Sequence, residues 1–120
     1  MMMAAAERQT DLQLGLLTQP GINLWMSGIR SMYQLARVKH NINSSDELWA
    51  LTRHYLTARL PDEGEEMMQW FRAVLIGEHN VTLAEAKVIL PAYECNTPLI
   101  DALRELLTKG RPTDWQWDLD

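Results

Sequence analysis

The sequence predicts an all-α fold: a compact bundle of five or six short helices with a central helical hairpin at about 45–76 and an extended C-terminal tail. Three observations lead to this prediction. Apolar residues recur at three- and four-residue steps in several segments. A capping residue followed three positions later by Glu marks three helix starts. No segment of useful length alternates apolar and polar residues as a half-buried strand does.

Length and composition fit one folded unit. The chain has 120 residues, of which 47% are hydrophobic and 22% are charged, as in ordinary globular domains. A chain of this length can bury a core without disulfides or metals. We therefore expect a single helical domain over 1–110, frayed at 1–10, followed by an aromatic and acidic tail at 111–120.

The first third of the chain predicts two helices. Leu12, Leu16 and Leu17 favour a short helix that must stop before the Pro20-Gly21 breaker pair. The longest periodic segment follows and extends to about Val38. Its apolar stripe consists of Ile22, Trp25, Met26, Ile29, Met32, Tyr33 and Ala36.

The central hairpin is predicted from paired start signals. Ser44 precedes Glu47 by three residues, as in a capping box. After the short Leu60-Pro61 break, Pro61 fits the first turn of a second helix, and Asp62 with Glu65 repeats the capping pattern. Gly77 fits a left-handed helix end. The facing stripes are expected to nucleate the core through their aromatic residues, Trp49, Tyr55, Trp70 and Phe71.

Two more helices are predicted after the hairpin. Thr82 and Glu85 form a third capping box, and Pro91 should end or kink the helix that they start. Thr97-Pro98 is typical of a helix start, because proline fits the first turn. The last helix should close at about Gly110.

Several chemistries are disfavoured by the sequence. His40, His54, His79 and Cys95 do not have the paired spacings of zinc sites, so we expect no metal site. The acidic run at 63–66 fits a helix N-terminus, where negative charge is favoured. No phosphate-binding glycine loop, nucleophile elbow or metalloprotease helix occurs. We therefore expect a non-enzymatic protein with no catalytic residues and no cofactor.

Location is inferred from what the sequence lacks. No apolar run approaches the roughly 20 residues of a membrane span, and residues 1–15 lack the features of a secretory signal. A single cysteine, Cys95, cannot form an internal disulfide. We expect a cytoplasmic protein without membrane contact.

The tail allows two interpretations. Trp115 and Trp117 are two residues apart, which places both indoles on one side of an extended chain. Either they fold back and seal a groove on the bundle, or they dock on another protein. In the second case Trp115, Trp117 and Asp118 are the partner-binding residues.

The predicted function is a protein–protein interaction module: an adaptor, a chaperone-like partner or a subunit of a larger assembly. A homodimer is a further expectation, because short helices with wide apolar faces often need additional cover. The net charge of −5 is uneven. Residues 1–60 contain six Lys/Arg and four Asp/Glu (+2), whereas residues 61–120 contain five and twelve (−7).

The alternative function is DNA binding. Residues 35–59 resemble a helix-turn-helix, in which the second helix would enter the major groove. The basic first half of the chain would then contact phosphates. The candidate nucleic-acid-binding residues are Arg30, Arg37, Lys39, Ser45 and Arg53.

Overall fold

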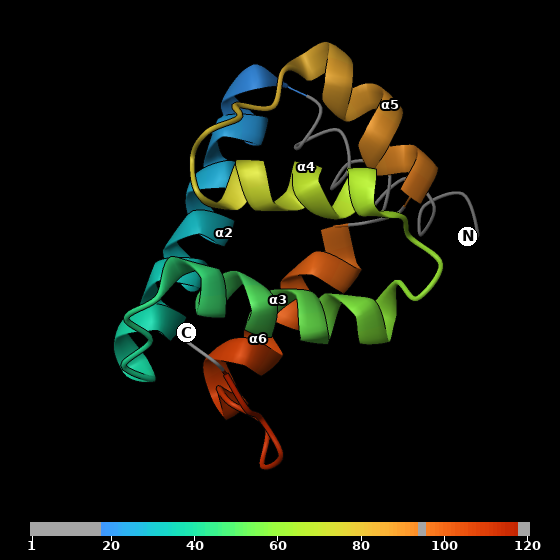
Figure 1. Ribbon diagram of the computed structural model, residues 1–120. Coiled ribbons are helices and arrows are strands. Elements are labelled where there is room, and N and C mark those ends of the chain that lie inside the picture. The colour runs from blue at the N-terminus through green and yellow to red at the C-terminus, as the bar shows by residue number, and fades with distance from the viewer. Residues whose placement is uncertain (1–17, 94–95, 118–120) are drawn as a thin grey trace, which may run out of the picture.

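A computed structural model describes residues 18–93 and 96–117 of the chain. It contains five helices in these ranges and no strand, which confirms the all-α prediction (Figure 1). None of the described helices is both long and apolar enough to cross a membrane. The helices are α2 (Gln19–Lys39), α3 (Ser45–Arg59), α4 (Glu65–Leu75), α5 (Leu83–Tyr93) and α6 (Asn96–Lys109).

α2 begins earlier than its apolar stripe predicts. The Thr18 hydroxyl accepts a hydrogen bond from the Gly21 N–H at 3.1 Å, and Pro20 lies in the first turn. Proline fits there because a first-turn N–H has no partner within the helix. The Pro20-Gly21 pair, predicted to stop a preceding helix, thus lies in the first turn of α2. The helix expected around residues 12–17 lies outside the described residues.

The start of α4 differs from the prediction. The N-cap is Gly64 and not Asp62, and no side chain caps this helix. The reason is local: the Glu63 N–H bonds to the Leu60 carbonyl at 3.3 Å, so residues 60–63 form a turn with Pro61 at its second position. Proline is used here to turn the chain. Gly77 has φ +85°, as its predicted role as a helix end requires.

In two predicted capping boxes, the hydroxyl of the N-cap residue caps the helix, but the Glu carboxylate does not bond back to the N-cap N–H. The Ser44 hydroxyl accepts from the Glu47 N–H and the Thr82 hydroxyl accepts from the Glu85 N–H, each at 3.2 Å. Both carboxylates are used elsewhere. That of Glu85 accepts hydrogen bonds from the Trp70 indole at 3.0 Å and contacts His79 Nε2 at 2.7 Å.

Two predicted boundaries near the end of the chain shift by a few residues. α5 continues two residues beyond Pro91, to Tyr93. α6 begins at Asn96, two residues before Pro98. Proline is tolerated in the first turn of a helix because the N–H that it lacks would have no partner within the helix.

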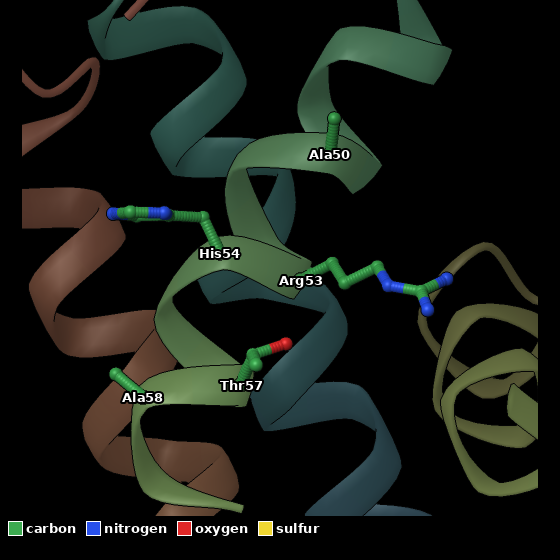
Figure 2. A pocket seen from close by; sticks show the side chains of 5 residues that line it. All are labelled: Ala50, Arg53, His54, Thr57 and Ala58. Atoms are coloured by element: carbon green, nitrogen blue, oxygen red, sulfur yellow. The ribbon is translucent and has the colours of Figure 1, made fainter. Parts of the chain in front are cut away.

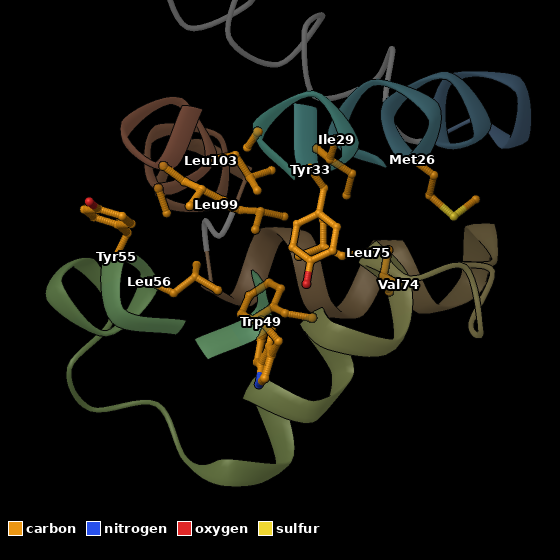
Figure 3. Packing of buried hydrophobic residues seen from close by; sticks show 14 of the residues in the cluster. Met26, Ile29, Tyr33, Trp49, Tyr55, Leu56, Val74, Leu75, Leu99 and Leu103 are labelled. Carbon is orange, nitrogen blue, oxygen red and sulfur yellow. The ribbon is translucent and has the colours of Figure 1, made fainter. Parts of the chain in front are cut away.

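The core contains residues of all five helices. The predicted α2 stripe is buried except for Met32, which packs on its edge. Figure 3 shows Met26, Ile29 and Tyr33 pointing into the same interior as α6 residues Leu99 and Leu103. Burial raises the pKa of Tyr33 to about 12, so its phenol stays neutral at physiological pH. Of the four aromatic residues predicted to nucleate the core, Trp49, Tyr55 and Phe71 are buried and Trp70 is half-buried.

α6 packs extensively against both α2 and α3. α3 and α4 lie next to each other (Figure 1) and are joined by two ion pairs, Arg72 with Asp46 and Arg53 with Glu65. α4 and α5 pack against α2, so α2 and α6 together connect the described helices.

The residue that follows α6, Gly110, lies very close to the His40 ring. Gly110 has φ +64°, and a Cβ at this position would lie 2.5 Å from the His40 ring. The Gly110 carbonyl accepts the Tyr55 hydroxyl at 2.7 Å, and His40 Nε2 lies 2.8 Å from the Leu107 carbonyl. Gly110 is therefore required both by its backbone conformation and by the space that His40 occupies.

We predict that Gly110→Ala lowers the free energy of unfolding by about 2–4 kcal/mol, because left-handed strain and overpacking add. Gly77→Ala is the matched control. Its φ is also positive, but a Cβ there meets nothing within 4 Å, so only about 1–2 kcal/mol should be lost. Urea denaturation followed by circular dichroism measures both values. Equal losses would contradict the role of the His40 contact.

Candidate functional site

The described surface contains a shallow groove on the outer face of α3. It has a volume of about 490 Å³ and is lined by five residues of this helix, Ala50, Arg53, His54, Thr57 and Ala58. The spacing of these residues follows one face of the helix. Three of them, Ala50, Thr57 and Ala58, have small side chains. Arg53 and His54 point to opposite sides (Figure 2).

Arg53 forms one wall of the groove. Its guanidinium donates two hydrogen bonds to the Glu65 carboxylate, which also accepts from the Gln69 amide at 2.8 Å. These hydrogen bonds, led by those from Arg53, lower the pKa of Glu65 to about 2. The Arg53 guanidinium is thus paired with a carboxylate, and this ion pair holds the side chain in position beside the groove.

Aromatic residues from the C-terminal part of the chain lie next to His54, although they do not line the groove themselves. The Trp115 ring packs edge-on near the His54 ring, with centroids 6.0 Å apart. Trp117 stacks on Trp115 at 6.4 Å with an interplanar angle of 5°. Both tryptophans are half-buried, and the Trp117 indole nitrogen is buried with no hydrogen-bond partner among the described residues. We call Trp115 and Trp117 the aromatic wall.

Glu47 fixes the aromatic wall in place. Its side chain is nearly buried, and its carboxylate accepts two hydrogen bonds from Arg111 at 2.8 and 2.9 Å and one from the Trp115 indole at 3.0 Å. Arg111 also donates to the His40 carbonyl at 2.8 Å. The Arg111 hydrogen bonds lower the pKa of Glu47 despite the opposing effect of burial. A buried charge with this many donors binds the tail to α3.

Of the predicted site residues, Arg53 lines the groove, Trp115 lies next to His54, which also lines it, and Trp117 stacks on Trp115. They had been assigned to different functions, Arg53 to nucleic acid and the tryptophans to a protein partner. The third predicted partner-binding residue, Asp118, lies outside the described residues.

The other candidate nucleic-acid residues are dispersed. Arg30 caps the end of α4, donating to the Val74 carbonyl at 2.7 Å and the His79 carbonyl at 2.9 Å. Arg37 and Lys39 are exposed in the last turn of α2. Ser45 is the exposed first residue of α3. Arg30 is thus engaged in holding α2 against α4, and only the remaining three are open to solvent.

Sequence reasoning missed the two residues on which the groove depends most. Glu47 was interpreted as part of a capping box, and Arg111 as part of a tail with no assigned contact. Glu47 and Arg111 are 64 residues apart in the chain, so no local pattern links them. His54 was considered only as a possible metal ligand. The spacing of Ala50, His54 and Ala58, one helical turn apart, could have predicted that small side chains share a face of the helix with His54.

The candidate metal ligands of the sequence do not gather in the part of the chain that the structure describes. Among these residues, no group of three or more His, Cys, Asp or Glu side chains is placed to hold a metal ion. The His54 ring packs near the rings of Tyr55 and Trp115. Cys95 lies outside the described residues. The groove itself combines small side chains, His54 and one paired cation, Arg53.

Comparison with known proteins gave no match to a family model, to a curated protein or to a solved structure.

We predict that Glu47→Gln lowers the free energy of unfolding at pH 7 by about 1.5–3 kcal/mol, since charged hydrogen bonds are lost at a nearly buried position. Because the pKa of Glu47 is lowered by folding, its contribution is fully present above its ordinary value of 4.5 and is lost as pH falls through the lower folded value. The variant should therefore lose less stability than the wild type on acidification.

Thermal denaturation between pH 7 and pH 3, followed by circular dichroism, measures this difference. Glu65→Gln is the control, since it removes an ion pair that is exposed to water and should cost less at pH 7. Identical acid sensitivity in Glu47→Gln and the wild type would contradict the assignment.

Proposed function

We propose that this protein is a small non-enzymatic protein–protein interaction module of the cytoplasm, acting as an adaptor, a chaperone-like partner or a subunit of a larger assembly. The α3 groove is its binding surface. The observation that carries the proposal is a face of small residues on α3 beside His54, whose ring packs near the Trp115–Trp117 stack. Tryptophan is among the residue types that most often dominate binding energy at protein interfaces.

The groove favours a helical or extended peptide segment as its occupant. A floor formed by Ala50, Thr57 and Ala58 allows a partner backbone to approach α3 closely, as in grooves that bind an amphipathic helix. The half-buried rings of Trp115 and Trp117 add aromatic surface near His54. Arg53 adds a side chain that is already held in position by its ion pair with Glu65.

The predicted architecture forms part of this proposal. A hairpin over 45–76 is supported by the ion pairs Asp46–Arg72 and Arg53–Glu65. Arg53 lies seven residues after Asp46 on α3, whereas its partner Glu65 lies seven residues before Arg72 on α4. That relation is expected for antiparallel neighbours. In the proposal the hairpin carries the groove, and residues 111–120 act as a tail that completes its wall.

The DNA-binding alternative over 35–59 receives less support. Arg30 and Arg53 donate to groups within the chain, and Asp46 and Glu47 bring carboxylates to the first turn of α3, where phosphates would approach. Arg37 and Lys39 are the remaining exposed cations of the candidate set.

We expect no retention of a mixed-sequence DNA duplex at low salt, measured by fluorescence anisotropy. Salt-sensitive binding that Arg37→Ala weakens would favour the alternative over the interaction module.

Site-specific photo-crosslinking tests the proposed binding surface. A photoreactive amino acid at the exposed position Thr57 should give a covalent adduct with a partner protein in extracts of the source organism. The same amino acid at Lys87, which is exposed on α5, should give none. Trp117→Ala should reduce the Thr57 adduct by roughly tenfold or more, as expected for an interface anchor.

Two results would contradict the proposal. One is the same set of adducts from Thr57 and from Lys87. The other is a Thr57 adduct that is unchanged by Trp117→Ala in a variant with the wild-type circular dichroism spectrum.

A further inference from the structure

We draw no further inference here: the strongest candidate, the side-chain cluster at the start of α3 in which the nearly buried Glu47 carboxylate accepts hydrogen bonds from Arg111 and Trp115, belongs to the site already described and is occupied by the chain's own C-terminal residues.

Discussion

The Glu47 carboxylate is the constraint on which the rest of this structure depends. The residue is 6% exposed, and a buried charge is tolerated only when donors surround it. Arg111 and Trp115 supply these donors from the far end of the chain. One ionised group in the first turn of α3 therefore determines where the last described residues lie.

The same interaction links stability to the proposed binding surface. Trp115 is held by Glu47, and Trp117 stacks on Trp115, so the aromatic wall has a fixed position before any partner arrives. A preformed wall reduces the conformational entropy lost on binding. Arg53 is likewise positioned in advance by Glu65. A substitution at Glu47 should therefore disturb both the stability of the fold and the proposed binding surface.

Much of the fold could be predicted from local patterns. The stripe from Ile22 to Ala36 identified the buried face of α2, and Gly77 was correctly assigned a left-handed conformation. Local rules failed where distant residues decide the outcome. Glu47 could have bonded back to Ser44, but Arg111 and Trp115 compete for it from 64 and 68 residues away. Pro61 was assigned to a helix because a turn and a first helical turn use the same proline geometry.

The position of α6 has a consequence for how the protein is made. α2 and α3 both pack on this helix, yet it is the last helix described in the chain. Until α6 has been synthesised, the apolar residues of α2 and α3 that pack on it lack this cover. The contacts of α2 with α4 and α5 do not require α6, but the core that includes α6 must wait for this helix, and those apolar residues stay exposed in the nascent chain during that interval.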